Sequence, residues 1–411
     1  MNTTDRPVPT PDEPVSAPDG SGPASKGPVP APDRQAPAPD GQAPAFDEPA
    51  PAPDEQAPAP DEPAPVPEEP APVPSHASDG PEPATDRPAL AIRGLRITLP
   101  GTARPVLDGI DLTVATGETV ALVGESGSGK SLTSRSALRL LPPGAVTEGT
   151  VRVDGQDVLG LDPDRLRALR TGTAAMVFQD PRAAINPLRR IGDFLTESVR
   201  ATKRMTAAQA TDRAVELLDA VGLDRTALTK YPGQVSGGML QRVMIAAALM
   251  GDPTLLLADE PTTALDVTTQ AEVIALLGTL RERFGTGLLF VTHDLDLAAA
   301  ISDRVYVMYA GRIAESGPAE ELFARPRHPY TAALLASTPR LENPRGRLAA
   351  IDGQPPDLRV ELTGCAFAAR CPLVTELCER QAPVSLSAPG RPGHRAACHH
   401  SDRLEGSAVD A

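Results

Sequence analysis

The sequence lacks any run that approaches about 18 consecutive apolar residues, so no segment is expected to span a bilayer. Tryptophan is absent, and aromatic residues make up only 3% of the chain. Residues 1–30 also lack the basic start and following apolar run of a secretory signal. We therefore expect the chain to remain in the cytoplasm, where a role at a membrane would depend on docking onto other chains.

Positive charge is also scarce. The chain has 39 Lys and Arg but 54 Asp and Glu, which gives a formal net charge of −15. Residues 1–88 hold 17 acidic and 4 basic residues, a charge of −13, which leaves about −2 for the remainder. The acidity therefore belongs to the first segment. The rest of the chain has no overall positive charge that would predict binding to nucleic acid.

Residues 1–88 also contain 26 of the 47 prolines and a seven-residue unit that repeats from Pro30 to about Ala71. A period of seven can indicate a coiled coil, but proline disrupts a helix interior and excludes one here. With so little apolar surface, this tail cannot offset its ordering entropy. We predict a disordered, extended and self-repelling chain that acts as a spacer or, alternatively, as a docking segment for a partner.

Cysteine is absent before residue 365, and this late clustering favours a metal site over disulfides in a reducing compartment. The spacing is C-x5-C-x6-C-x19-C, and Pro372 follows the second cysteine. Four thiolates suit a [4Fe–4S] cluster, but they also satisfy tetrahedral zinc, and His394, His399 or His400 could replace a ligand. Spacing alone leaves both metals open. The candidate ligands are Cys365, Cys371, Cys378 and Cys398.

Strand and helix patterns alternate from about residue 89 onward. Short apolar runs at 119–124, 255–260 and 287–293 are typical of buried strands, and residues 269–285 have the periodicity of an amphipathic helix. Further expected elements are strands at 90–99 and 106–114, a hairpin at 150–158 turning at Asp154-Gly155, and helices from 131 to about 142 and at 207–223. This order predicts an α/β fold with a mainly parallel sheet and helices on its faces.

A phosphate-binding motif, G-x4-G-K-S, lies between the strand at 119–124 and the helix that follows it. Its glycines let backbone amides converge on phosphate oxygens, and the helix start adds partial positive charge. Lys130 would contact the β- and γ-phosphates, and Ser131 would ligate Mg²⁺. The predicted ATP-binding residues are Gly124, Glu125, Ser126, Gly127, Ser128, Gly129, Lys130 and Ser131.

Two acids end the buried strand at 255–260, at the sheet edge where α/β proteins bind ligands. Asp259 is placed to hold Mg²⁺ through water, and Glu260 to act as a general base on the attacking water. Alone, such a pair could simply cap a helix. Together with the phosphate loop, it favours ATP hydrolysis.

A helix is expected at about 239–250, and it begins within the segment Val235-Ser-Gly-Gly-Met-Leu-Gln-Arg242. This segment resembles the LSGGQ signature of ABC ATPases. Val replaces Leu and Met replaces Gln. Alone, Ser236 could be an ordinary helix cap. The resemblance implies that a set of signature residues contacts ATP bound to an opposite cassette: Ser236, Gly237, Gly238 and Met239.

Three further segments resemble motifs of that family, and all of the motifs occur along this chain in the family's order. Gln179, within Val177–Pro181, resembles the Q-loop residue that reaches Mg²⁺ and the attacking water. Asp266 ends a D-loop-like Ala-Leu-Asp, and His293 resembles the switch histidine that contacts the γ-phosphate. Residues 89–340 are thus identified as an ABC ATP-binding cassette. The resemblance implies a parallel sheet core with an antiparallel β subdomain and a helical subdomain.

The adenine contact departs from the family pattern. ABC cassettes usually stack adenine on an aromatic residue in the early strand, and alignment of residues 95–99 puts Leu99 there. Leucine can touch the base but provides no π-stacking.

The segment after the cassette, residues 341–411, resembles the C-terminal region of dipeptide and oligopeptide importer ATPases. The similarity rests on Gly353-Gln-Pro-Pro356 and the cysteines, together with His328-Pro329-Tyr330 near the end of the cassette. The resemblance implies that the four cysteines hold a [4Fe–4S] cluster, with Zn²⁺ as the alternative. It also implies that ATP and Mg²⁺ are the cofactors of hydrolysis.

The same resemblance implies an importer that moves dipeptides or oligopeptides. Its partners would be two transmembrane permease subunits, a second and different ABC ATPase subunit, and an extracytoplasmic substrate-binding protein. The chain would lie peripherally on the cytoplasmic face of the cell membrane. Nickel or another small solute is an alternative cargo. A soluble ABC ATPase without a permease is a further alternative, although no second cassette or long coiled-coil insertion is found.

Overall fold

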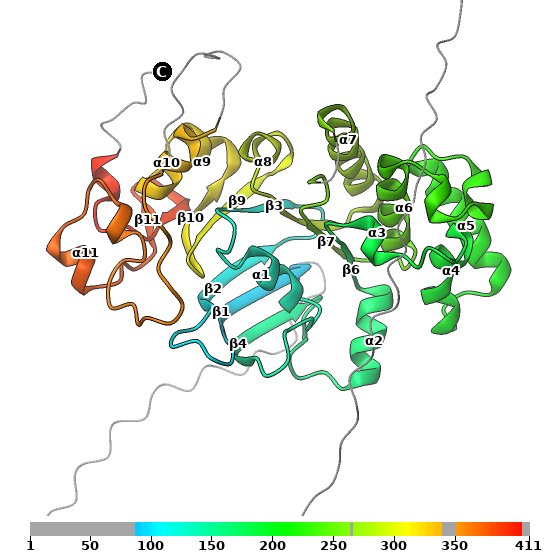
Figure 1. Ribbon diagram of the computed structural model, residues 1–411, viewed down its shortest axis with the longest axis horizontal. Helices are drawn as coiled ribbons and strands as arrows, with labels where there is room; N and C mark the ends of the chain where they lie inside the picture. Colours follow the sequence, from blue (N-terminus) through cyan, green and yellow to red (C-terminus); the bar gives the residue numbers. More distant parts are fainter. Residues whose placement is uncertain (1–86, 264–265, 339–350, 405–411) are drawn as a thin grey trace, which may run out of the picture. The chain divides into compact units, whose positions relative to one another are not determined.

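The computed structural model describes residues 87–263, 266–338 and 351–404, all of which belong to one compact unit, Ala77–Ala411. The predicted acidic tail therefore lies outside the described residues, apart from its last two. Two sheets form the framework of the described chain, one antiparallel and one mixed (Figure 1).

The antiparallel sheet has the order β2-β1-β4-β5. Its alternating pattern places one face in the core, as in β1, where Leu90, Ile92 and Ile97 are fully buried. The predicted hairpin is confirmed, because Asp154 and Gly155 have φ of 47° and 75° between β4 and β5. The strands are β1 (Leu90–Thr98), β2 (Leu107–Val114), β4 (Val146–Val153) and β5 (Gln156–Asp157).

The mixed sheet has the order β11-β12-β10-β9-β3-β8-β7-β6. Strands β9, β3, β8, β7 and β6 are parallel, and the remaining three extend one edge in antiparallel pairing. Strands β3, β7 and β8 are buried at every position, as expected for strands covered on both faces. The bounds are β3 (Thr119–Val123), β6 (Ala174–Val177), β7 (Leu255–Asp259), β8 (Gly287–Val291), β9 (Arg304–Tyr309), β10 (Arg312–Pro318), β11 (Leu386–Ala388) and β12 (Arg391–Ala396).

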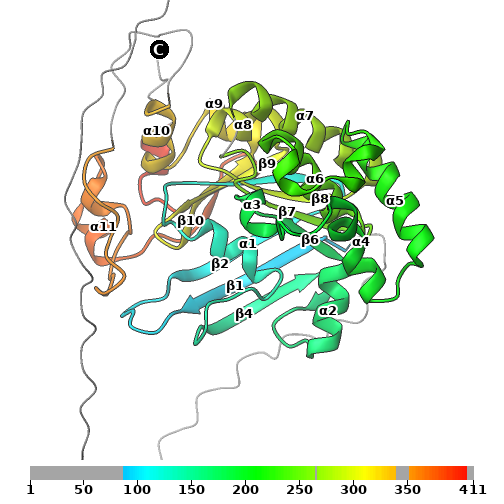
Figure 2. The same ribbon diagram turned by 45° about the vertical axis from the view of Figure 1, so that its right-hand side comes forward.

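The two faces of this sheet pack against different layers. Along β7, Leu255 and Leu257 join the core shared with the antiparallel sheet, whereas Leu256 and Ala258 join the core under the helices. Figure 2 shows this order of layers, with the antiparallel sheet on one side and α5, α6 and α7 on the other. The predicted α/β architecture is confirmed.

The helices match most of the expected positions. The helix after the phosphate loop is the exception, because it ends at Ser136 and not near residue 142. Arg139 adopts a left-handed φ of 50°, and the Leu140 amide donates to the Arg135 carbonyl, which closes the helix early. The bounds are α1 (Lys130–Ser136), α2 (Pro163–Gly172), α3 (Pro181–Ala184), α4 (Ile191–Ala201), α5 (Ala207–Ala220), α6 (Gly237–Leu249), α7 (Val267–Phe284) and α8 (Leu295–Ile301). Among the described residues, no helix is long and apolar enough to cross a membrane.

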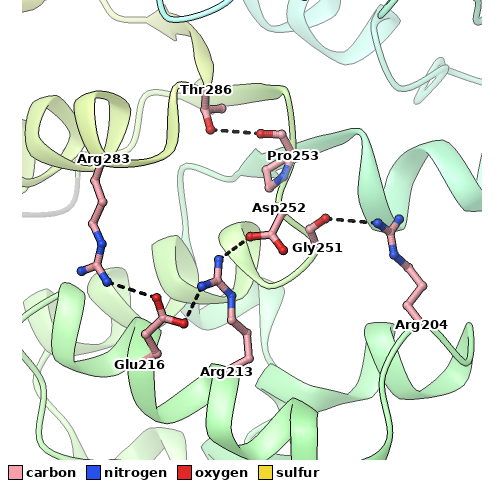
Figure 3. Close-up of polar contacts among 8 residues, drawn as sticks. All are labelled: Arg204, Arg213, Glu216, Gly251, Asp252, Pro253, Arg283 and Thr286. Atoms are coloured by element: carbon pink, nitrogen blue, oxygen red, sulfur yellow. Dashed lines mark hydrogen bonds and ion pairs between the residues drawn. The ribbon is translucent and has the colours of Figure 1, made fainter.

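A charged network joins helix α5 to the base of the mixed sheet and to the end of α7 (Figure 3). Arg213 donates to both Glu216, at 2.6 Å, and Asp252, which lies just before β7. Glu216 also accepts from Arg283 of α7 at 3.1 Å. The Arg213 side chain is only 15% exposed. The network therefore fixes the helical layer to the sheet at the end opposite the phosphate loop.

The C-terminal elements are built onto the antiparallel edge of the mixed sheet. The buried Glu315 of β10 accepts hydrogen bonds from the backbone amides of Arg327, at 2.7 Å, and His328, at 2.9 Å. It also pairs with His394 of β12 at 2.7 Å. One carboxylate thus holds three separate chain segments together. The remaining helices are α9 (Ala319–Ala324), α10 (Pro329–Ala336) and α11 (Glu376–Arg380).

Candidate nucleotide-binding site

The predicted phosphate loop joins the end of β3 to the start of α1. Gly124 has φ 147°, and a Cβ atom there would lie 2.1 Å from the Met308 carbonyl oxygen, so a side chain cannot be accommodated. Gly129, the residue before α1, has φ 102°. The loop conformation therefore depends on glycine at both ends. Between them, the backbone is free to present amides toward an anion.

Lys130 begins α1 and is only 5% exposed. Its ammonium group donates to the carbonyl oxygens of Gly124, at 2.7 Å, and Glu125, at 3.0 Å. Burial lowers the pKa of Lys130, while the negative charges of Glu260, Asp259 and Glu125 oppose this shift. The single lysine charge is thus held against the phosphate loop.

The acidic end of β7 faces the phosphate loop. The Ser131 hydroxyl donates to Asp259 Oδ1 at 2.7 Å, and Arg135 pairs with the other carboxylate oxygen at 3.3 Å. Asp259 is 2% exposed. A hydroxyl and a carboxylate at this distance are oxygen donors of the kind that Mg²⁺ prefers. The structure therefore brings together two of the three predicted Mg²⁺ residues, whereas the third, Gln179, bonds Glu260.

Glu260 follows β7 in a left-handed conformation with φ 48°, which is unusual for a residue other than glycine. Its amide donates to the Val291 carbonyl of β8 at 2.9 Å, which holds the backbone in place. Strain of this kind often occurs where a side chain must be aimed at a functional site.

Three side chains surround the Glu260 carboxylate. Gln179 Nε2 donates to Oε2 at 3.1 Å, and the Thr263 hydroxyl donates to the same oxygen at 3.0 Å. His293 Nδ1 lies 3.5 Å from Oε1. Three predicted residues from different segments, Gln179, Glu260 and His293, therefore converge. Thr263 was not predicted, although it lies only three residues after Glu260.

The predicted signature residues form the start of α6. Ser236 is the cap, and its hydroxyl oxygen accepts from the Met239 amide at 3.2 Å. Asp266 caps α7 in the same way through the Thr269 amide at 3.0 Å. A Cβ atom on Gly238 would lie 2.7 Å from the Thr269 side chain, so the two helix starts adjoin. Gly237 is the first residue of α6, and the other two residues of the predicted D-loop, 264–265, lie outside the described part of the chain.

Leu99 lies directly after β1 and is half-buried against the core shared with the antiparallel sheet. The Thr102 amide and hydroxyl both donate to its carbonyl, at 3.3 and 2.9 Å. A small cavity beside the phosphate loop is lined instead by Arg104, Val106 and C-terminal residues such as Pro356. The adenine contact of Leu99 stays a prediction.

The loop also has contacts from the C-terminal part of the chain that sequence patterns did not reveal. The Glu125 amide donates to the Tyr330 hydroxyl at 2.8 Å. The Glu125 carboxylate forms an ion pair with Arg370. These partners lie 205 and 245 residues further along the chain, beyond the reach of any local periodicity.

The four cysteines are free thiols. The Cys365 amide donates to the Cys378 carbonyl at 2.7 Å, which brings two of them close in the fold. Across the described residues, no three His, Cys, Asp or Glu side chains are arranged to hold a metal ion. The histidines named as possible substitutes have other partners: His394 bonds Glu315, His399 bonds the Gln381 carbonyl, and His400 bonds Thr375.

Comparisons with known proteins agree with this geometry. The family described as ABC transporter matches residues 107–263, and the family described as oligopeptide/dipeptide transporter, C-terminal region, matches residues 314–378. The oligopeptide transport ATP-binding protein OppD of Salmonella typhimurium is 42% identical over 306 residues, which cover 74% of this chain and 91% of OppD. The dipeptide transport ATP-binding protein DppD of Bacillus subtilis is 42% identical over 301 residues, covering 72% of this chain and 90% of DppD.

Solved structures are also similar. A dimeric post-hydrolysis state of the ATP-binding cassette MJ0796, bound to ADP and Pi, is 29% identical with a TM-score of 0.50; the match covers 56% of this chain and 98% of that cassette. CbiO1 from Clostridium perfringens is 26% identical with a TM-score of 0.52, and the match covers 58% of this chain and 91% of CbiO1. The chain belongs to the ATP-binding, ATP-hydrolysing subunits of the ABC transporter family.

Proposed function

We propose that this ATPase powers the import of dipeptides or oligopeptides from the cytoplasmic face of the cell membrane. The observation that carries the proposal is the combination of two matched regions in one chain, a cassette and an oligopeptide/dipeptide-type C-terminal region. The relatives named above are peptide transport proteins. Nickel or another small solute is the alternative cargo, because a cassette does not itself touch the transported solute.

We propose the following roles within the site. Glu260 activates the attacking water as general base, while Gln179 and His293 sense the γ-phosphate. Ser131 and Asp259 hold Mg²⁺, with Gln179 as a further ligand. The loop from Gly124 to Ser131 binds the phosphates of the chain's own ATP. Leu99 contacts adenine, and the residues at the start of α6 contact ATP on a second cassette: Ser236, Gly237, Gly238 and Met239. Asp266, at the adjoining start of α7, belongs to the D-loop.

The assembly would contain two transmembrane permeases, a second and different ABC ATPase and an extracytoplasmic substrate-binding protein. One segment is proposed for the permease contact. Leu188 is 85% exposed and lies in this segment, which leads from Gln179 to α4. We assign the permease contact to this segment on the family resemblance, since a single exposed leucine is common on protein surfaces. Because Gln179 touches Glu260, closure around ATP would reach this segment directly.

The decisive experiment is ATP hydrolysis by the complete complex in lipid vesicles, with short peptides, longer peptides and nickel chelates as separate stimulants. We expect peptides alone to raise turnover, since binding-protein docking favours the closed cassette pair. Stimulation by nickel alone would contradict the peptide assignment. Hydrolysis by the isolated chain that no permease alters would support a soluble ATPase instead.

We also propose that Cys365, Cys371, Cys378 and Cys398 hold a [4Fe–4S] cluster. Each cysteine thiolate that holds such a cluster binds a different iron, so the four thiols need not converge on one ion as they would for zinc. The Leu373 amide donates to Cys371 Sγ at 3.4 Å and the His400 amide to Cys398 Sγ at 3.3 Å. Thr375 lies 3.5 Å from Cys378 Sγ. Hydrogen bonds to sulfur are a feature of cluster sites.

Metal analysis of protein purified without oxygen would test this cofactor. We expect about four irons and four sulfides per chain, with a visible charge-transfer absorbance. Cys371→Ser should lower the iron content. Zinc in place of iron would favour the alternative, and neither metal would contradict the proposal.

A further inference from the structure

Glu125 places a carboxylate in the phosphate loop, and this carboxylate carries the same charge sign as the triphosphate that the loop is proposed to bind. In the structure, Arg370 forms an ion pair with this carboxylate. The guanidinium makes two parallel contacts, from Nη1 to Glu125 Oε2 and from Nη2 to Oε1, both at 2.9 Å. The side chains are only 5% and 24% exposed. A bidentate, largely buried pair of this kind is strong and directional.

Arg370 is held rigidly by the C-terminal region. Its Nε donates to the Asp352 carbonyl at 2.9 Å, and Nη2 donates to the Ile351 carbonyl at 3.0 Å. Nη1 also donates to the Tyr309 hydroxyl at 3.2 Å, and the guanidinium lies 5.7 Å from the centre of that ring. These contacts prevent the guanidinium from following a moving partner. The guanidinium is therefore a fixed partner for the Glu125 carboxylate.

The backbone of Glu125 is held from both sides as well. Its amide donates to the Tyr330 hydroxyl, and its carbonyl accepts from Lys130. The carboxylate and the amide are thus fixed by C-terminal residues, while the carbonyl is bonded to the lysine predicted to bind phosphate. Loss of Arg370 would leave an unpaired carboxylate beside the phosphates and beside Lys130.

We infer that Arg370 is a positioning residue of the nucleotide site, which neutralises and anchors Glu125 so that the phosphate loop accepts ATP. The C-terminal region thereby contributes directly to ATP affinity. This inference rests on the proposed role of the phosphate loop. Its physical basis is the repulsion between an unpaired carboxylate and a triphosphate at close range in a partly buried site.

The test is a titration of the full chain with a fluorescent ATP analogue, followed by KM and kcat for the assembled complex. Arg370→Gln should raise the Kd and the KM about tenfold, since one unpaired charge is left near the phosphates, and should change kcat little. The Glu125→Gln, Arg370→Gln double variant should regain most of the affinity. A purely structural role for the pair predicts the opposite, a double variant no better than Arg370→Gln.

Arg380→Gln is the matched control, because Arg380 pairs with Glu376 in the same region but is 75% exposed. It should bind ATP as the parent does. Arg370→Lys keeps a charge and should recover part of the affinity even if Arg370→Gln unfolds. Unchanged affinity in both Arg370 variants would overturn the inference. If Lys130→Ala also leaves the affinity for the ATP analogue unchanged, the phosphate-loop assignment is wrong. The inference about Arg370, which depends on that assignment, is then wrong as well.

Discussion

Glu260→Gln is expected to bind ATP with nearly parental affinity but to hydrolyse it slower by a factor on the order of 10²–10⁴. The Gln side chain has the same shape and can still bond Gln179 and Thr263, which lie 3.1 and 3.0 Å from the present carboxylate. It cannot take a proton from water. The substitution therefore slows the chemical step of hydrolysis and not the binding of ATP. The left-handed backbone conformation at residue 260 needs no change.

Phosphate release by the assembled complex, together with an ATP-binding titration, measures the two effects separately. Glu272→Gln is a suitable control, since Glu272 is a half-exposed carboxylate on α7 that pairs with Arg242 at 2.7 Å. It should hydrolyse ATP at the parental rate. Turnover that stays unchanged in Glu260→Gln would remove Glu260 from the role of general base.

Lys130→Ala is expected to weaken ATP binding roughly 100-fold, in the upper range for a hydrogen bond to a charged group. Lys130 is the only cation that the structure holds directly against the carbonyls of Gly124 and Glu125 among the described residues. Its removal takes away the charge proposed for the β- and γ-phosphates. It also removes one hydrogen bond from each of two loop carbonyls, so that the Glu125 carbonyl keeps only the Ser128 amide at 3.2 Å, which loosens the loop proposed to enclose the phosphates.

Equilibrium titration with an ATP analogue measures the change, and thermal unfolding shows whether the variant still folds. Lys230→Ala serves as the control, because Lys230 lies at the end of a short 3-10 helix, Arg225–Thr229, before the signature segment. That variant should keep its affinity. An equal affinity in Lys130→Ala would contradict the phosphate-loop assignment itself.

Much of the fold could be predicted because its signals are local. The buried runs of β3, β7 and β8 and the Asp154-Gly155 turn are properties of neighbouring residues, so pattern and turn chemistry were sufficient. The length of α1 was not predicted correctly. Its early end depends on the left-handed conformation of Arg139, a residue type that gives no such signal in the sequence.

The sequence by itself determined the class of protein, an ABC ATPase, because each motif keeps its candidate functional groups within a few residues of a strand end or a helix start. Lys130 with Ser131 and Asp259 with Glu260 are such pairs. Tertiary structure alone decided which distant groups meet them. The ion pair between Glu125 and Arg370 joins residues 245 positions apart. Only the packing of the C-terminal region onto the sheet edge brings them together, since chain connectivity favours no particular contact at that separation and only adds a closure cost that grows slowly with loop length.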